Sequence, residues 1–409
     1  MSCKPSPYKT APANIPGIAP RGWEWLLDNW LSRIEVGKLT VTFPSGFEKT
    51  FGGHVDGPSA KIDIYSWRLI PRLLLSGDIG LAESFMNGEW DTSDLSQLIL
   101  LGDMNERALG DAVTPSTIVS FLERLRHGRR TNSKRGSKRN IAAHYDLGNN
   151  FYAEWLDNSM SYSSAIFDNE DEGLELAQRR KYLRLAKKLG LKEGETVLEI
   201  GCGWGGFAEI AAQEFKCKVV GVTLSTEQAT YAKARMQDAE VSNLVEIRVQ
   251  DYRDIRGHFD KIVSIEMFEA VGAKHWRNYF KLLKNRLNME GKAAVQCITI
   301  ADSFFEVYKR RPDFIQKYIF PGGILPSESA LNRSINDAGL AVLESHYFGK
   351  SYAETLRRWH INFEERWSQI KKLGFDEQFK RMWRYYLSYC EAGFETGHIN
   401  VGQFIISSR

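Results

Sequence analysis

The feature that most constrains the fold is a regular alternation of β-type and helical runs that begins near Ile141. Short apolar runs such as TVLEIG (196–201), KVVGVTL (218–224) and DKIVSIEMF (260–268) are separated by longer segments with helical periodicity. Strands that alternate with helices at this spacing predict a doubly wound, mostly parallel α/β sheet of the Rossmann-like type. Such a sheet binds its ligand outside the carboxyl ends of its strands, so the turns after these runs are the first candidates for a site.

Length and composition limit the remaining possibilities. A chain of 409 residues favours two domains, and 43% hydrophobic with 26% charged residues is typical of a globular protein. No run approaches the roughly 18 uncharged apolar residues of a membrane-spanning helix, and the start has no signal-peptide core. We therefore expect a cytoplasmic protein that at most lies on the inner face of the cytoplasmic membrane. Five scattered cysteines without a CxxC pair argue against a disulfide framework and against a structural metal.

The chain divides into four predicted segments. Residues 1–20 form a flexible tail, 21–123 a smaller, mostly helical domain for lipid binding or dimerisation, 124–140 a linker, and 141–409 the α/β domain. Within the second segment, the stretch 39–53 alternates apolar and polar residues around Pro-Ser-Gly and predicts a hairpin. One helical face there either packs on a core or contacts lipid or a partner subunit; it carries Trp23, Leu27, Trp30, Leu31 and Ile34.

The linker is strongly basic. Residues 124–139, RLRHGRRTNSKRGSKR, hold eight Lys/Arg and no acid. Such a segment cannot pack a core. Anionic lipid headgroups are its favoured partner, at about 1 kcal/mol per basic residue near the surface. A solvated linker without a partner and nucleic acid are the alternatives.

The strongest local motif is the glycine-rich turn VLEIGCGWGG (197–206). Glycines such as Gly201 and Gly203 let the backbone turn sharply and let a ligand approach closely. The acidic Glu199 beside this turn would repel a pyrophosphate, and no Lys-Ser/Thr follows as a phosphate loop requires. A cationic ligand fits better. S-adenosylmethionine (SAM), with its ammonium and sulfonium charges, is the expected co-substrate.

Two further turns fall where such a fold places cofactor contacts. Thr223, Ser225 and Gln228 follow the second strand, and Asp251 and Tyr252 follow the third. Asp251 could accept a hydrogen bond from an adenine amino group, and Tyr252 could stack or offer its backbone N–H. Each residue alone is more often a cap or turn residue, but together, in register with the strands, they favour a SAM site.

At these residues the sequence resembles the cyclopropane-fatty-acyl-phospholipid synthases, a family that includes the mycolic-acid cyclopropane synthases and methyltransferases. The resemblance runs collinearly from about residue 65 to the C-terminus, and the N-terminal GLAESFMNGEWD resembles the phospholipid-acting branch. The other matching stretches are HYDLGNNFY, MSYSSAIF, VLEIGCGWGG, GVTLSTEQ, QDYRD, MFEAVG, YIFPGG, YYLSYCEAGF and QFIISSR.

The resemblance implies a reaction. The SAM methyl carbon becomes a methylene bridge across the cis double bond of an unsaturated phospholipid acyl chain at the membrane. Separately, we expect the protein to be a homodimer. The resemblance also adds Tyr162 and Ser163 to the residues expected at the SAM site. It also implies a bicarbonate ion as the base, held by Ser164, Glu269, Gln296, Ile298 and Tyr352.

Some positions depart from the family pattern. Ser164 stands where the family often has Cys, and Gln296 and Ala270 stand where it often has His. Loss of an ionisable His weakens ring closure, so a methyltransferase that makes methyl- or methylene-branched chains is the alternative. Cys390 corresponds to a cysteine once assigned to the active site. Because an alkene needs no thiol nucleophile, a packed structural thiol is the competing interpretation.

Two other classes compete. A nucleic-acid methyltransferase would favour an Asn/Asp-Pro-Pro-aromatic or a Pro-Cys motif, and neither occurs, so we expect no nucleic-acid partner. A lipid-binding protein with an inactive SAM fold is disfavoured by the intact glycine turn and by Glu269. Calorimetry with SAM and sedimentation with liposomes distinguish these classes, because the enzyme is expected to bind both.

Overall fold

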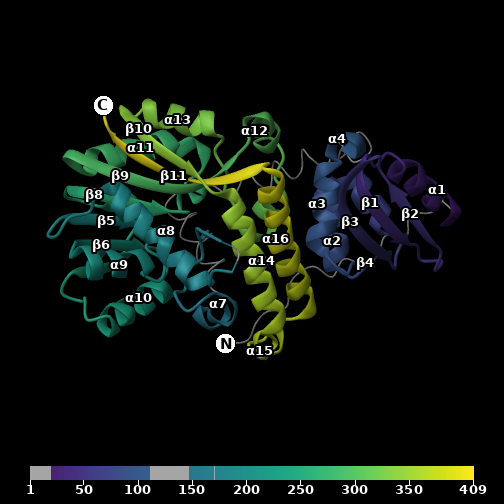
Figure 1. Cartoon of the computed structure of the whole chain (residues 1–409), viewed down its shortest axis with the longest axis horizontal. Coiled ribbons are helices and arrows are strands. Elements are labelled where there is room, and N and C mark those ends of the chain that lie inside the picture. The colour runs from purple at the N-terminus through teal and green to yellow at the C-terminus, as the bar shows by residue number, and fades with distance from the viewer. Residues whose placement is uncertain (1–19, 111–146, 170) are drawn as a thin grey trace.

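The computed structural model describes residues 20–110, 147–169 and 171–409. A smaller N-terminal domain lies at one end of the molecule and the α/β domain at the other, and the long helices α14 and α16 stand between them (Figure 1). The predicted tail up to residue 19, the end of the predicted first domain (111–123), the basic linker and residues 141–146 lie outside the described residues. Among the described helices, none is both long and apolar enough to cross a lipid bilayer.

The α/β domain is built on a seven-stranded sheet with the order β10-β11-β9-β8-β5-β6-β7. The pairs among β5 to β9 are all parallel, which confirms the predicted doubly wound sheet, and β11 runs antiparallel between β9 and β10. The strands are β5 (Thr196–Ile200), β6 (Lys218–Thr223), β7 (Val245–Val249), β8 (Phe259–Ile265), β9 (Leu287–Ile300), β10 (Leu340–Tyr347) and β11 (Ile399–Ser408).

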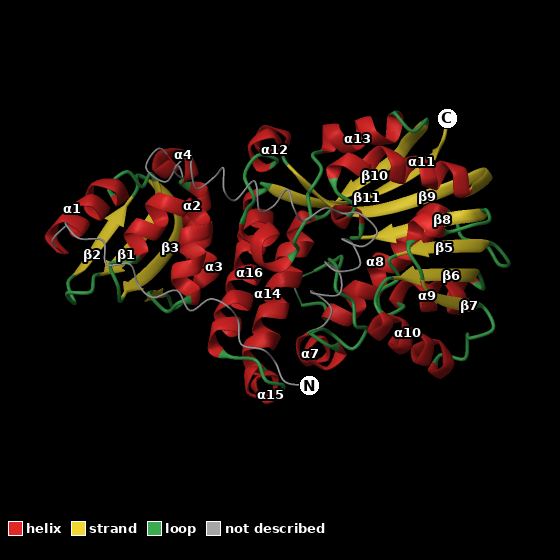
Figure 2. Ribbon diagram, turned by 180° about the vertical axis from the view of Figure 1, so that it is seen from behind, coloured by secondary structure: helices red, strands yellow, loops and turns green. Residues whose placement is uncertain are grey.

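Helices cover both faces of this sheet (Figure 2). Successive strand residues point to opposite faces, so Val197 packs with α8 and α9, whereas Leu198 packs with α11 and α13. The helices and short turns of this domain are α7 (Asn149–Trp155), α8 (Leu174–Leu189), α9 (Gly206–Phe215), α10 (Thr226–Asp238), η2 (Tyr252–Asp254), η3 (Phe268–Ala270), η4 (Ala273–His275), α11 (Trp276–Arg286), α12 (Asp302–Tyr308), the π-helix η5 (Ile315–Ile319), α13 (Glu328–Asn336), α14 (Gly349–Glu365), α15 (Trp367–Lys372) and α16 (Glu377–Thr396).

The N-terminal domain combines helices with a four-stranded sheet of order β2-β1-β3-β4. The predicted hairpin is present as the antiparallel pair β1 and β2, and β3 adds to β1 in parallel. Leu27, Leu31 and Ile34 are buried, so the predicted helical face packs on the core of this domain. The elements are α1 (Pro20–Leu31), β1 (Val36–Thr42), β2 (Glu48–Gly52), β3 (Val55–Ile64), α2 (Leu69–Met86), β4 (Trp90–Asp91), α3 (Leu95–Met104) and α4 (Glu106–Leu109).

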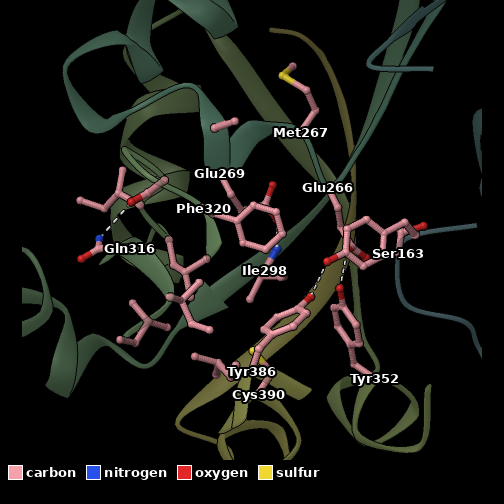
Figure 3. Close-up of a pocket in the computed structure, with 18 of the residues that line it drawn as sticks. Ser163, Glu266, Met267, Glu269, Ile298, Gln316, Phe320, Tyr352, Tyr386 and Cys390 are labelled. Carbon is pink, nitrogen blue, oxygen red and sulfur yellow. Dashed lines mark hydrogen bonds between the residues drawn. The ribbon is translucent and has the colours of Figure 1, made fainter. Parts of the chain in front are cut away.

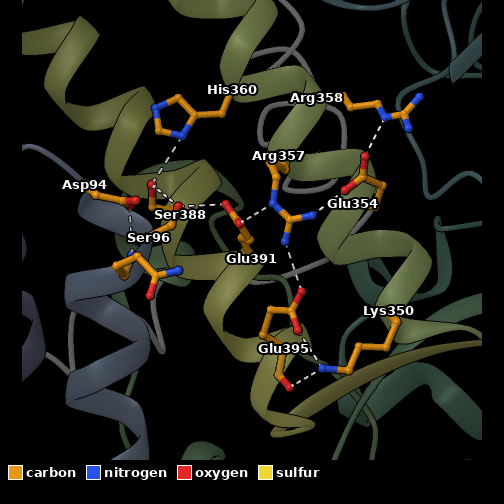
Figure 4. A network of polar contacts seen from close by, with 11 residues as sticks. Asp94, Ser96, Lys350, Glu354, Arg357, Arg358, His360, Ser388, Glu391 and Glu395 are labelled. Atoms are coloured by element: carbon orange, nitrogen blue, oxygen red, sulfur yellow. Dashed lines mark hydrogen bonds and ion pairs between the residues drawn. The ribbon is translucent and has the colours of Figure 1, made fainter. Parts of the chain in front are cut away.

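Helix α16 joins the two domains. Ser96 of α3 donates a hydrogen bond of 2.7 Å to Glu391 of α16, and Arg381 of α16 pairs with Asp91 at 2.6 Å. On the α14 side, Arg357 contacts Glu391 at 3.1 Å, which completes a polar network across three helices (Figure 4). The contacts fix the N-terminal domain against the helices that border the site.

Candidate active site

A cavity of about 700 Å³ opens at the carboxyl ends of β5, β6 and β8. It extends from the glycine-rich turn along α14 and α16 to the N-terminal domain, where Ser76, Asp78 and Ile99 line it. The position agrees with the site expected for a doubly wound sheet. One continuous space therefore connects the predicted nucleotide turn with the junction of the two domains.

The glycine-rich turn lies at one end of this cavity. Gly201 has φ 81° and donates its N–H to the Val222 carbonyl at 2.9 Å, and Gly203 has φ 51°. L-residues rarely adopt these values. A Cβ added to Gly203 would meet nothing within 4 Å, so this glycine leaves the turn open for a ligand.

Glu199 stands at the end of β5 and lines the same cavity. Its side chain is 3% exposed, and its Oε2 has no hydrogen-bond partner among the described residues. Burial raises the pKa of Glu199 to about 8, although the charge of Arg235 acts against this. A buried carboxyl group with one unpartnered oxygen is suited to the cationic part of a ligand, as the sequence predicts.

The other predicted SAM contacts are only partly brought together. Thr223 and Gln228 line the cavity, and the Thr223 hydroxyl donates to Gln228 Oε1 at 2.9 Å. Tyr252 also lines it, and burial raises the pKa of Tyr252 to about 12. Ser225 instead caps α10 through Gln228 N–H, and Asp251 caps η2 and binds Arg253; neither lines the cavity. Short polar side chains at a helix start cap the helix, which is the alternative the sequence left open.

The segment before α8 adds two expected residues, and α8 itself adds an unexpected one. Tyr162 and Ser163 line the cavity, and the Tyr162 and Tyr386 hydroxyls lie 2.9 Å apart. Ser163 accepts a hydrogen bond of 2.6 Å from Lys181, a fully buried lysine whose pKa burial lowers to about 8. The sequence analysis missed Lys181, although its spacing from Ala177 and Leu185 places it on the apolar face of a helix.

Glu266, which follows β8, is the second functional residue that the sequence analysis missed. Its carboxylate accepts hydrogen bonds from the Ser164 backbone N–H at 2.9 Å and from Gln296 Nε2 at 2.8 Å. It also accepts one from the Tyr352 hydroxyl at 2.7 Å (Figure 3). A visible signal was an acidic residue at the carboxyl end of an apolar β-run, where Glu199 also stands in β5.

The position of the Glu266 carboxylate conflicts with the expected bicarbonate site. The donors predicted to hold the ion at Ser164, Gln296 and Tyr352 already bind Glu266, and the Ile298 N–H donates to Glu269 Oε1 at 2.5 Å. The Ser164 hydroxyl donates to the backbone carbonyl of the next residue, and the side-chain oxygen of Gln296 accepts from Gln403, so Glu269 Oε2 is the one predicted ion-holding atom left without a partner in the described part of the chain. The residues present therefore do not fit a bicarbonate ion in the predicted arrangement.

Glu269 and Cys390 also line the cavity, as predicted. Glu269 Oε2 has no hydrogen-bond partner within the described part of the chain, and burial, together with the nearby Glu266, raises the pKa of Glu269 to about 8. Burial also raises the pKa of the Cys390 thiol, which keeps it protonated. A neutral thiol on α16 contributes to the cavity wall and offers no thiolate nucleophile.

Comparison with known proteins supports this geometry. The family described as mycolic acid cyclopropane synthetase matches residues 132–404. The chain belongs to this family. It is 38% identical to the tuberculostearic acid methyltransferase UfaA1 of Mycobacterium tuberculosis over 83% of this chain and 81% of that protein. It is 36% identical to the cyclopropane-fatty-acyl-phospholipid synthase of Escherichia coli over 82% of this chain and 85% of the relative.

A solved structure shares the fold of the α/β domain. The mycolic acid cyclopropane synthase CmaA1, in complex with SAH and CTAB, is similar with a TM-score of 0.62 and 30% identity, over 66% of this chain and 97% of that one. Family and fold together make this chain a SAM-dependent methyltransferase, and the turn at Gly201, Gly203 and Glu199 is the part of the cavity that suits SAM.

Proposed function

We propose that this protein transfers the methyl carbon of SAM to the double bond of an unsaturated phospholipid acyl chain. One observation carries the proposal: the cavity that begins at the glycine-rich turn continues past two carboxyl groups along a mainly apolar wall. An acyl chain fills such a space while its double bond lies beside the turn. The wall includes Ile99, Ile298, Phe320, Leu356, Tyr386 and Tyr389.

The chemistry needs little from the protein beyond placement and a base. SAM, when bound, supplies an electrophilic methyl group. The π electrons of the alkene form the new carbon–carbon bond, the sulfur keeps the electrons of the broken bond, and the neighbouring chain carbon becomes a cation. The faces of Tyr162, Phe320 and Tyr386 at the cavity wall stabilise such a charge. If the added methyl group loses a proton and its C–H electrons close the ring, the product is a cyclopropane, our first expectation.

A branched chain is the second candidate product, and the observation that favours it is the absence of an ionisable His at Gln296 and Ala270. Proton loss from the next chain carbon gives a methyl-branched alkene, and a hydride shift before proton loss from the methyl group gives a methylene branch. Both need a base but no reductant. The relatives support both candidates, since one is named for tuberculostearic acid and another for a cyclopropane.

We extend the proposal to the membrane. A phospholipid substrate places the enzyme on the inner face of the cytoplasmic membrane, where residues 124–139 meet anionic headgroups. We also propose a homodimer, which sedimentation equilibrium tests directly. A monomer at micromolar concentration would contradict that part of the proposal.

Product analysis tests the proposed function. The enzyme is incubated with methyl-labelled SAM and vesicles of dioleoyl phosphatidylglycerol, and the acyl chains are separated by gas chromatography and analysed by NMR. Because ring and branch have the same mass, NMR assigns the product. Labelled acyl chains are expected. SAM binding without label in any lipid, across vesicles of several headgroups and double-bond positions, would contradict the proposal.

A further inference from the structure

We propose that Glu266 is the proton acceptor of this site and occupies the place where bicarbonate was expected. The inference rests on the proposed function, and it makes the catalytic base part of the chain. It follows from the contacts of one carboxylate, its backbone conformation and its neighbouring charges.

The hydrogen bonds of Glu266 leave one acceptor position. An ionised carboxylate offers about four lone-pair directions. Oε1 accepts from the Ser164 N–H and from Gln296, and Oε2 accepts from Tyr352. No other donor to Glu266 occurs among the described residues, so the second lone pair of Oε2 is available. Since Glu266 lines the cavity, this lone pair can accept a proton from a bound chain.

The backbone shows that Glu266 is held in this place. Its φ is 48°, in the left-handed region that favours glycine, and its N–H donates to the Gln296 carbonyl at 2.7 Å. A non-glycine residue in this region is strained, and such strain tends to persist at functional sites. The conformation also means that Glu266→Gly removes the carboxylate without adding backbone strain.

The surrounding charges support this role. The buried ammonium of Lys181 favours the ionised form of Glu266, while burial raises the pKa of Glu266 above its ordinary value. A base whose pKa lies closer to neutral is more effective at physiological pH. The step is balanced: the C–H proton moves to Oε2, the C–H electrons form the ring bond or the new double bond, and the proton then leaves to solvent.

Bicarbonate dependence distinguishes an internal base from a bound ion. Wild-type enzyme in carbonate-free buffer is expected to work at full rate and to gain less than about twofold on addition of millimolar bicarbonate. Glu266→Gln keeps the size of the side chain and an acceptor oxygen for the neighbouring donors, but it removes the base. The rate of this variant should fall on the order of 100-fold or more while its SAM affinity is kept. Bicarbonate should not restore it, because the amide still fills the site.

Glu266→Gly provides the complementary test. This variant frees the three donors, so it should bind ¹³C-bicarbonate by NMR where wild type does not, and bicarbonate should raise its rate about tenfold or more. Glu290→Gly is the matched control, since Glu290 also has a positive φ of 64° but is exposed away from the cavity. It should behave like wild type.

The outcomes separate this inference from the proposed function. A wild-type enzyme that needs bicarbonate, or a Glu266→Gln enzyme with a wild-type rate, overturns the inference while lipid methylation stands. A wild-type enzyme that labels no lipid under any condition overturns the proposed function. Rescue of Glu266→Gly alone, together with an inactive Glu266→Gln enzyme that still binds SAM, supports the internal base.

Discussion

Glu199 combines burial with an unsatisfied oxygen, and this combination has a measurable consequence at the residue scale. Because burial raises the pKa of Glu199 to about 8, much of the free protein carries a neutral carboxyl group at pH 7. A bound cation favours the ionised form and therefore lowers this pKa. Binding of SAM should release a proton.

The resulting prediction concerns the pH dependence of SAM binding. Between about pH 5 and 8 the dissociation constant should fall as pH rises, by at most about tenfold per pH unit. Calorimetry in two buffers with different ionisation enthalpies measures the released proton directly. Glu199→Gln should remove most of the pH dependence, and Glu199→Ala should abolish binding with the fold retained. A SAM affinity that is independent of pH in wild type, or unchanged in Glu199→Ala, would contradict this role.

At the scale of elements, Arg357 of α14 is the ion-pair partner of a buried carboxylate on α16, Glu391. Glu391 is 6% exposed, and Arg357 at 3.1 Å and Ser96 at 2.7 Å are its hydrogen-bonding partners. Removal of one partner of a buried charge is costly, but the side chain of Arg357 is 43% exposed and water screens part of the interaction. The network therefore matters more than a surface ion pair and less than a fully buried one.

Arg357→Met is expected to lower the free energy of unfolding by about 1–2 kcal/mol in urea titrations. Glu391→Gln in the same chain should recover part of the loss, because the unpaired buried charge is then gone. Lys371→Met serves as the control: it breaks a pair in which both side chains are at least 60% exposed and should cost less than about 0.5 kcal/mol. Equal losses for the two single variants would show that burial of Glu391 plays no part.

On the scale of the whole molecule, membrane association is predicted to depend on the basic segment. Neutral replacements at six positions should weaken binding to anionic liposomes, with little effect on neutral ones: Arg129, Arg130, Lys134, Arg135, Lys138 and Arg139. The difference should shrink with salt, because exposed charges are screened within about 8–10 Å at physiological ionic strength. Liposome sedimentation at two salt concentrations measures both effects. Unchanged binding at low salt would leave the segment as a linker only.

The sheet and the glycine-rich turn were predictable because their signals are local. Apolar runs and helical periodicity identify β5 to β9, and Gly201, Gly203 and Glu199 lie within one short turn. Ser225 and Gln228 also carry a local signal, since a serine followed three residues later by Gln is a capping pattern.

The set of hydrogen-bond donors around the Glu266 carboxylate could not be predicted in the same way. Its donors Ser164, Gln296 and Tyr352 come from segments up to about 190 residues apart in sequence, and only the folded chain shows that all three face one carboxylate. The sequence pattern names the donors but does not reveal which acceptor they share. The antiparallel insertion of β11 is equally non-local, because its partners β9 and β10 precede it along the chain.

The place of β11 also bears on how the chain reaches its native state. Until Ile399–Ser408 docks, β9 and β10 each present an unpaired edge, and the long edge of β9 is rich in apolar residues. Such edges template aggregation, and a pairing about one hundred residues distant in sequence forms slowly. Because Gln403 of this strand also holds Gln296, deletion of β11 should yield inclusion bodies rather than a soluble methyltransferase with reduced turnover.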